Sequence, residues 1–227
     1  YDCIAMAIAE ENLPVKICCA LPGLTTGYGP SHQATEDLAI MRGMPNLTVI
    51  DPCCAVEIDQ ATRAIADTPG PVYMRLLRGQ VPNVLGEYGY EFKLGRAQTI
   101  RDGGDVLFIS SGIMTMRVLD AAARLATDGI SCAVLHSPTI KPLDAETIID
   151  QARKGGRLVI TAENHSVTGG LGEAVAGALM RAGAHVPFRQ IGLPDEFLDA
   201  GALPTLHDQY GLTVDAIAAR VKTWLEA

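Results

Sequence analysis

The chain has 227 residues, of which 48% are hydrophobic and 19% charged, and its formal net charge is −8. This composition predicts a packed globular core and excludes a disordered chain, while the acidic balance without clustered Lys or Arg argues against a nucleic-acid partner. No apolar run approaches the roughly 20 residues needed to cross a bilayer, so we expect no membrane association.

The first part of the chain alternates short apolar runs with helix-length segments. Residues 1–12 predict the end of a helix, because Ile4, Ala5 and Ile8 share one face. Further along, the pattern predicts strands over 15–20, 48–50 and 71–76, a loop over 21–31, and helices over 34–42 and 55–67. With about three strands, this part is too short to close a sheet comfortably. We therefore expect a truncated domain.

The periodicity breaks in the stretch VPNVLGEYGYEFKL, residues 81–94, which contains Pro, Asn and Gly and has no repeat. We interpret this stretch as a linker between two domains. The predicted division is a first domain over 1–82, a linker over 83–95 and a second domain over 96–227.

The second part shows a further set of alternations. They predict strands over 105–110, 131–135, 157–162 and 186–191, and helices over 114–127, 144–154, 171–182 and 214–226. The runs VLFIS, CAVLH and LVIT lack polar alternation, as strands do when both faces of a parallel sheet are covered by helices. The predicted fold class is α/β, in two parts.

The six cysteines occur in apolar surroundings, with no CxxC pair and no histidine at metal-ligand spacing; they are Cys3, Cys18, Cys19, Cys53, Cys54 and Cys132. We expect buried, reduced thiols and a cytoplasmic protein rather than a disulfide framework or a zinc site. No metal ligand is assigned to this chain.

Four segments, in order, resemble the transketolase family of thiamine-diphosphate enzymes. The first is GLTTGYGPSHQATEDLAIMRGMPNLTVIDP (23–52), which is similar to the family's loop–helix–strand. The others are GPVYMRLLRGQVP (70–82), VITAENHSVTGGLGEAVAGAL (159–179) and IGLPDEFLDAGALPTLHDQYGLTVDAI (191–217). The layout is closest to the C-terminal half of transketolase, which some organisms encode as a separate subunit.

The resemblance implies the latter part of a pyrimidine-binding domain followed by a Rossmann-like C-terminal domain. In the family, the glutamate that contacts the pyrimidine and the aromatic residues that stack on it precede the point where this chain starts. Glu10 and Glu11 lie after that motif and are not assigned the role. We therefore expect the chain to be part of a longer polypeptide or a split enzyme, and to be inactive alone.

His32 is the predicted catalytic and cofactor-binding residue. The glycines before it, Gly27 and Gly29, allow a close backbone approach, and Pro30 stiffens the turn. An imidazole there can donate a hydrogen bond or move a proton near neutral pH. The resemblance places this position near the aminopyrimidine and the reacting sugar. The alternative is a histidine that caps the following helix or is merely exposed on a loop.

Arg78 is the predicted substrate-binding arginine. It follows an apolar strand, and parallel strands present ligands at their carboxyl ends, where a guanidinium can bind a phosphate. It also matches the family's phosphate-binding arginine. Arg75 is the competing candidate, three residues earlier. For either residue the alternative is a surface salt bridge, which we favour for Arg75 but not for Arg78.

The substrate loop departs from the family pattern. It is one residue shorter, and Tyr28 stands near the position of an aspartate that contacts a substrate hydroxyl in the family. A tyrosine can donate a hydrogen bond there but supplies no carboxylate, so we assign Tyr28 to substrate binding. Leu21 replaces a histidine, and Ser31 replaces a threonine. These changes predict an altered sugar preference.

Two further motifs are interpreted structurally. The glycines of Gly169–Gly170–Leu171–Gly172 are expected to permit tight helix–sheet packing rather than to bind an anion, because the full dinucleotide fingerprint is missing. The neighbouring Glu163–Asn164–His165 is expected to support the fold or an interface rather than catalysis.

The resemblance implies a C-terminal transketolase half that transfers a two-carbon ketol unit between sugar phosphates. Thiamine diphosphate and Mg²⁺, or another divalent ion, would be held mainly by an N-terminal partner subunit or segment, in a homodimer or heterotetramer. Alternatives are a deoxyxylulose-phosphate synthase, the beta subunit of a 2-oxoacid dehydrogenase, and a non-catalytic half that only assembles with or regulates an active enzyme.

Overall fold

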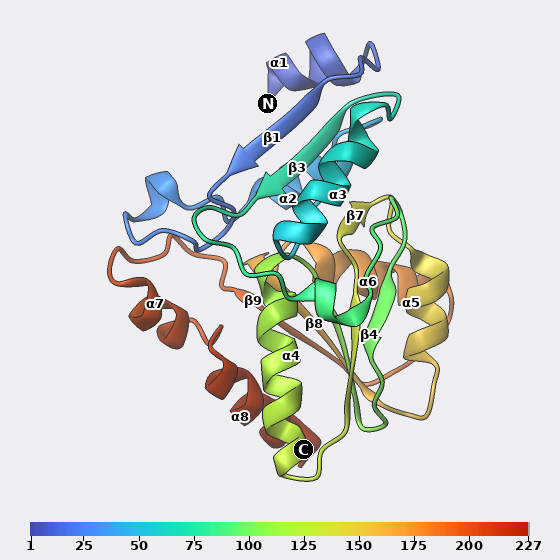
Figure 1. The fold of residues 1–227 in the computed structure, drawn as a ribbon, viewed down its shortest axis with the longest axis vertical. Helices are drawn as coiled ribbons and strands as arrows, with labels where there is room; N and C mark the ends of the chain where they lie inside the picture. Colours follow the sequence, from blue (N-terminus) through green and yellow to red (C-terminus); the bar gives the residue numbers. More distant parts are fainter. Residues whose placement is uncertain (227) are drawn as a thin grey trace.

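The computed structural model describes residues 1–226 and has two sheets, one built mainly from the first part of the chain and one from the second (Figure 1). The first sheet has the strand order β1-β3-β2-β7, and the second has the order β4-β6-β5-β8-β9. Within residues 1–226, no helix combines the length and apolar character needed to cross a bilayer. The α/β fold class predicted from the sequence is confirmed.

In the first part, the three predicted strands pair in parallel, with β3 between β1 and β2. The predicted helix over 1–12 is shorter in the structure and widens into π-type turns after residue 4, and the helix predicted over 34–42 begins only at Asp37. The elements are α1 (Asp2–Ile4), η1 (Ala5–Ala9), β1 (Lys16–Ala20), η2 (Pro30–His32), α2 (Asp37–Arg42), β2 (Thr48–Ile50), α3 (Ala55–Ala66) and β3 (Val72–Leu76).

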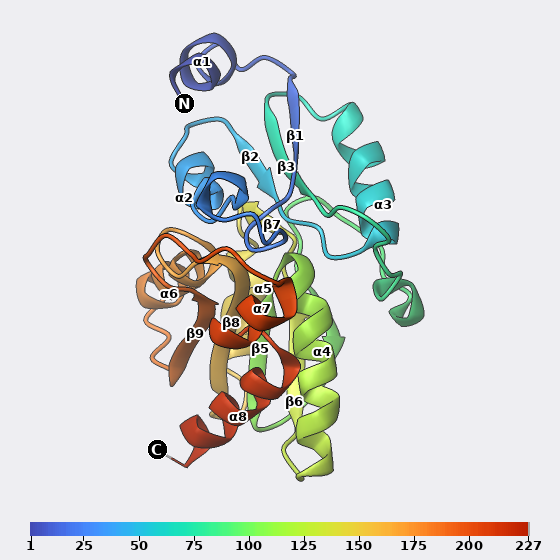
Figure 2. The same ribbon diagram turned by 90° about the vertical axis from the view of Figure 1, so that its left-hand side faces the viewer.

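The fourth strand of the first sheet comes from the second part of the chain. Strand β7 (Thr139–Lys141) pairs antiparallel with β2, and Val49 lies opposite Lys141. Figure 2 shows β7, in yellow, against the first sheet and away from the other strands of its own part. The two parts are therefore joined by backbone hydrogen bonds as well as by side chains.

The second sheet is covered by helices on both faces, as the apolar runs predict. Its elements are β4 (Gln98–Arg101), β5 (Val106–Ser110), α4 (Gly112–Thr127), β6 (Cys132–His136), α5 (Ala145–Ala152), β8 (Leu158–Ser166), α6 (Leu171–Arg181), β9 (Phe188–Leu193), α7 (Leu203–Gln209) and α8 (Val214–Leu225). Strands β5, β6, β8 and β9 are parallel, and β4 is an antiparallel edge.

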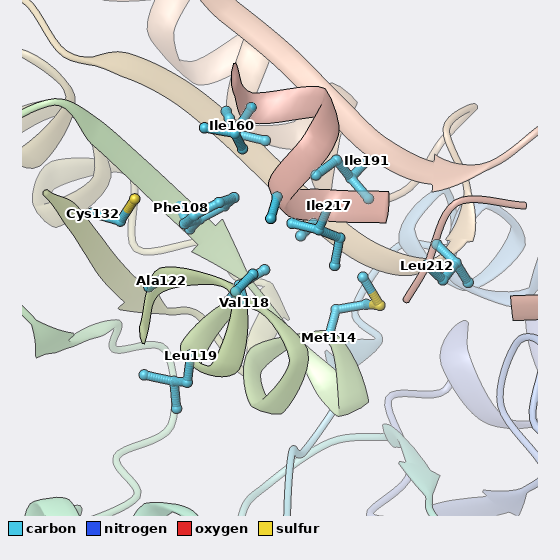
Figure 3. Packing of buried hydrophobic residues seen from close by; sticks show 14 of the residues in the cluster. Phe108, Met114, Val118, Leu119, Ala122, Cys132, Ile160, Ile191, Leu212 and Ile217 are labelled. Atoms are coloured by element: carbon cyan, nitrogen blue, oxygen red, sulfur yellow. The ribbon is translucent and has the colours of Figure 1, made fainter. Parts of the chain in front are cut away.

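Successive side chains of β5 point to opposite faces of this sheet. Phe108 packs with Val118 of α4 and Ile217 of α8, as Figure 3 shows. Leu107 and Ile109 instead pack in the cluster that contains residues of α5 and α6. Burial of both faces explains why the strand carries no polar residue before its final serine.

The segment interpreted as a linker is packed against the first sheet. It contains a short 3₁₀ turn, η3 (Leu85–Tyr88), and buries Leu85, Tyr90 and Phe92 against residues of α3 and β3. These apolar contacts fix its path.

The prediction that the cysteines are buried is correct for Cys53, Cys54 and Cys132 and wrong for the first two in the chain. Cys3 and Cys18 are exposed, because α1 lies at the surface and β1 is the edge of its sheet. All six thiols are free.

Candidate functional site

The candidate site lies where β1 and β3 end. These strands are parallel neighbours, and their last residues, Ala20 and Leu76, are partners in the register. The loop over 21–33 and the segment over 77–82 therefore leave the sheet at the same edge. Because Tyr28 and His32 lie on the first and Arg78 on the second, the topology brings all three predicted residues to one end of the sheet.

The loop presents Tyr28 and His32 together. Gly29, with φ of 91°, precedes the turn η2, which ends at His32. The two rings meet edge to face, with centroids 5.7 Å apart and an interplanar angle of 74°. The Ser31 hydroxyl lies 2.9 Å from His32 Nδ1. Both rings are exposed, so the imidazole is open to a ligand and is oriented by its two neighbours.

Arg78 shares a surface hollow of about 380 Å³ with Tyr28. The other wall of this hollow contains Gly201 and Leu203, which belong to the second part of the chain. The guanidinium of Arg78 is exposed and forms no ion pair with another residue of the 1–226 region. The structure thus brings Tyr28 to His32 on one side and to Arg78 on the other, while His32 does not line the hollow.

Arg75 is not the surface residue that the sequence suggested. Its side chain is 1% exposed and lies between two carboxylates, with Nη2 2.5 Å from Asp37 Oδ1 and Nη1 3.5 Å from Asp51 Oδ2. The guanidinium also donates to the carbonyl oxygens of Ala34 and Asn164. Because every direction of the fork is occupied, Arg75 holds the loop, α2 and β8 together and is unavailable to a substrate.

The two acids around Arg75 have opposite pKa shifts. Burial raises the pKa of Asp51, against the attraction of Arg75 and a 2.8 Å hydrogen bond from Ser111 Oγ. For Asp37, burial is outweighed by the charge and hydrogen bonds of Arg75 and by the Tyr73 hydroxyl, which donates at 2.6 Å, so its pKa is lowered. Sequence reasoning missed this cluster, because only the tertiary fold brings the two acids to the strand.

Glu163, Asn164 and His165 lie at the seam between the two parts of the chain, where Asn164 Oδ1 accepts from Leu24 N at 3.0 Å and His165 Nε2 accepts from Ala39 N at 3.3 Å. Glu163 accepts the backbone N–H groups of Leu171 at 2.6 Å and Gly172 at 2.8 Å. A Cβ on Gly170 would lie 1.9 Å from the Glu163 carboxylate, so the glycine motif permits this contact. The carboxylate occupies the start of α6, where a free anion would otherwise bind. The structural interpretation of both motifs agrees with this geometry.

A second buried network joins α3, the linker and β6. Both oxygens of Glu57 lie within 2.9 Å of His136 Nε2, and the Tyr90 hydroxyl donates to Glu57 at 2.5 Å. His136 Nδ1 is 2.8 Å from the hydroxyl of Thr115. Glu57 and His136 are fully buried. Nothing in the sequence pattern pairs these residues, and since all their polar atoms are partnered they serve the fold.

The loop residues suit the polar, reacting end of a ligand rather than a metal. Tyr28, His32 and Arg78 offer a phenol, an imidazole and a guanidinium, and no carboxylate lies among them. Across residues 1–226, no group of three or more His, Cys, Asp or Glu side chains is arranged as a metal site.

Two family models match the chain in succession. The model for the transketolase pyrimidine-binding domain matches residues 1–83, and the model for the transketolase C-terminal domain matches residues 95–217.

Three relatives illustrate the range of similar proteins. A putative transketolase family protein of Sinorhizobium fredii is 66% identical over 227 residues, and a 6-deoxy-6-sulfo-D-fructose transketolase subunit of a Clostridium species is 40% identical over 217 residues. The chain spans 66% of the length of each. A 1-deoxy-D-xylulose-5-phosphate synthase of Trichormus variabilis is 38% identical over 224 residues, which make up 35% of that protein.

A solved structure agrees closely with this fold. It is described as a split-gene transketolase in an inactive beta4 tetramer, and it shares 37% identity with a TM-score of 0.90. The match covers 99% of this chain and 71% of the other.

Proposed function

This chain belongs to the transketolase family, and on that premise we propose that it is the C-terminal half of an enzyme that transfers a two-carbon ketol unit between sugar phosphates. The observation that carries the proposal is the gathering of His32, Tyr28 and Arg78 at the shared end of β1 and β3. Relatives described as a transketolase subunit and a split-gene transketolase support it.

Each of the three residues has a role that its chemistry supports. His32 would donate a hydrogen bond or a proton to a substrate oxygen, since its ring is exposed and oriented by Ser31 and Tyr28. The Tyr28 hydroxyl would donate to a sugar hydroxyl. Arg78, with no carboxylate partner in the described region, would bind the terminal oxyanion of the sugar through its guanidinium fork.

The family's transketolases and deoxyxylulose-phosphate synthases depend on thiamine diphosphate, which supplies the carbanion chemistry when bound. His32 fits the reacting end of that group, being an exposed donor beside an aromatic ring. The divalent ion needs ligands of another kind, and within residues 1–226 no group of three or more His, Cys, Asp or Glu side chains could hold one. We propose that an N-terminal partner subunit or segment holds the diphosphate and this ion, in a homodimer or heterotetramer.

The test uses the complete enzyme, reconstituted with its N-terminal partner or segment. Donor ketoses and acceptor aldoses with a terminal phosphate are supplied, and a sulfonated analogue is included because one relative acts on a sulfosugar. We expect His32→Ala to lower the rate of ketol transfer about 10²-fold or more, as for loss of a proton-transfer group.

His185→Ala is the matched control, because His185 is an exposed histidine on the second part, far along the chain from the loop. It should leave the rate unchanged. If His32→Ala also left turnover unchanged, the chain would serve as a non-catalytic half that assembles with or regulates the enzyme.

A second candidate is a deoxyxylulose-phosphate synthase activity, which the 38% identical relative supports. A 1-deoxy sugar has a methyl group where a ketol-transfer product has a hydroxymethyl group. The product spectrum therefore separates the two activities when both ketose and 2-oxoacid donors are offered. A 1-deoxy sugar formed from the 2-oxoacid would favour the synthase activity. A ketose with a hydroxymethyl group, formed from the ketose donor, would favour ketol transfer.

A further inference from the structure

The second part of the chain makes close contacts with the loop that carries Tyr28 and His32. Figure 1 shows the segment before α7, in red, passing next to this loop, in blue. Gly201 N donates to Gly27 O at 3.0 Å, and Gln33 Nε2 donates to Asp199 O at 3.2 Å. The approach is close, since a Cβ on Gly27 would lie 1.8 Å from Gly201 O.

Leu24 contacts the second part through both its side chain and its backbone. Its side chain is fully buried and belongs to the core cluster of the second part, together with residues of α4 and α8. Its N–H donates to Asn164 Oδ1 at 3.0 Å. Its carbonyl oxygen lies 2.8 Å from His207 Nε2 on α7. Leu24 is thus held through its side chain, its N–H and its carbonyl, four residues before Tyr28.

The hydrogen on His207 is placed by Leu24. A carbonyl oxygen only accepts, so the imidazole hydrogen must be on Nε2, which lies 2.8 Å from Leu24 O. Arg117 Nη2, from α4, lies 2.8 Å from His207 Nδ1 and 3.4 Å from Nε2, and so stands beside both ring nitrogens. Its positive charge disfavours a second proton on the imidazole, so His207 holds the loop as the neutral ring with its hydrogen on Nε2.

Arg117 is itself anchored. Its Nη1 donates to Leu212 O at 3.0 Å, and it forms no ion pair with a carboxylate in the described region. Burial lowers the pKa of Arg117 to about 10, which still leaves it charged at neutral pH. Burial, and then the charge of Arg117, lower the pKa of His207 against the hydrogen bond to Leu24. The lowered pKa of His207 agrees with a neutral imidazole.

We propose that His207 and Arg117 are positioning residues, which fix the Leu24 carbonyl and so hold Tyr28 and His32 in their reactive arrangement. The inference rests on the proposed function of that loop. It assigns the second part of the chain a direct part in ordering the site.

The test compares two variants of His207 with a control variant in the complete enzyme. His207→Leu removes the hydrogen bond, and His207→Gln restores an N–H at the position of Nε2 and an acceptor for Arg117. His185→Leu is the control. We expect His207→Leu to accelerate amide hydrogen exchange over residues 25–32 at least about 10-fold, and by a larger factor than in β5. We also expect kcat for ketol transfer to fall about 10- to 100-fold, with a smaller change in KM, because a displaced catalytic group costs rate.

His207→Gln should recover most of both losses. Unchanged exchange over residues 25–32 in His207→Leu would show that His207 does not hold the loop. Faster exchange with unchanged kcat would overturn its positioning role. If the wild-type enzyme transferred no ketol unit, the proposed function would be wrong. The exchange data would still decide whether His207 holds the loop. Should His207→Leu fail to fold, His207→Asn, whose amide is too short to reach Leu24 O at this half-buried position, replaces it with the same expectations.

Discussion

At the scale of single residues, burial shifts the pKa values of Glu163 and His165 in opposite directions. Burial raises the pKa of Glu163 to about 7, against the hydrogen bonds from Gly172 and Leu171. Burial lowers the pKa of His165 to about 4, helped by the charge of Arg75. The Glu163 carboxylate and His165 Nδ1 lie 3.8 Å apart in the seam between the two parts.

These shifts make opposite contributions to stability. Between pH 4.5 and 7 the folded protein retains a proton on Glu163 that the unfolded chain has lost, so this contribution falls as pH rises. Between pH 6.5 and 4 the unfolded chain gains a proton on His165 that the folded protein does not, so that contribution falls as pH falls. Each is worth about 3 kcal/mol, and the two nearly cancel in the wild-type protein.

We predict that, when either residue is substituted, the free energy of unfolding shows the pH dependence that the other residue contributes. The free energy of unfolding of Glu163→Gln should rise with pH, relative to wild type, from about pH 4.5 to 7. That of His165→Gln should fall with pH, relative to wild type, from about pH 4 to 6.5. Urea unfolding at half-unit pH steps measures both curves. Parallel curves for the two variants would show that the buried pair does not titrate as described.

At the scale of elements, the start of α4 depends on a glycine. Gly112 has φ of 53°, and its N–H donates to Asp51 O at 2.9 Å. A Cβ there would lie 2.5 Å from Asp51 Oδ2, which also accepts the Ser111 hydroxyl. The helix can begin against β2 only if no side chain stands at this position.

We predict that Gly112→Ala lowers the free energy of unfolding by about 3 kcal/mol or more, the sum of backbone strain and a displaced buried carboxylate. Gly129→Ala is the matched control, because Gly129 has φ of 80° with nothing within 4 Å of the added Cβ. It should cost about 1 kcal/mol, from strain alone. Equal losses in the two variants, measured by urea unfolding, would contradict the contact with Asp51.

The elements best predicted from the sequence are those whose burial leaves a local pattern. Strand β5 was expected over 105–110 and lies at Val106–Ser110, since both of its faces meet helices. The polar end of β8 was not expected, because Glu163 to Ser166 are buried only through partners that the tertiary fold brings to them. Strands β4 and β7 were missed because they are short and pair antiparallel at edges of the sheets.

The same distinction applies to the candidate site. His32, Tyr28 and Arg78 were proposed from motifs and strand ends, which are local features. Leu24, Arg117 and His207 were not found, since Leu24 and His207 are 183 residues apart and Arg117 comes from a third element, α4. The burial of Arg75 was also missed, because its two acids lie on other elements.

At the scale of the whole molecule, one cluster of buried residues spans both parts. It contains Leu38 and Val49 of the first part with Leu107, Ile109 and Ile140 of the second. Strand β7 pairs with β2, and the buried contacts of Arg75 with Asn164 and of Glu57 with His136 cross the same boundary. Because these contacts must break when either part unfolds, we expect neither part to unfold without the other.

We therefore predict that residues 1–226 unfold as one cooperative unit, although the sequence reads as two domains. Phe108→Ala, in the core of the second part, should cost about 3 to 5 kcal/mol, because it leaves a cavity among α4, β5 and α8. The free energy that protects the amides of β3 from exchange should fall by the same amount. Strand β3 lies in the first part, and its residues Val72 and Met74 belong to a different core cluster from Phe108. Native-state hydrogen exchange measures both strands in one experiment. Equal losses in β3 and β5 indicate a single unit, since protection in β3 can then fail only when the whole structure opens. A loss confined to β5 would mean that the first part keeps its structure when the second opens, and that the shared cluster and β7 couple the two parts only weakly.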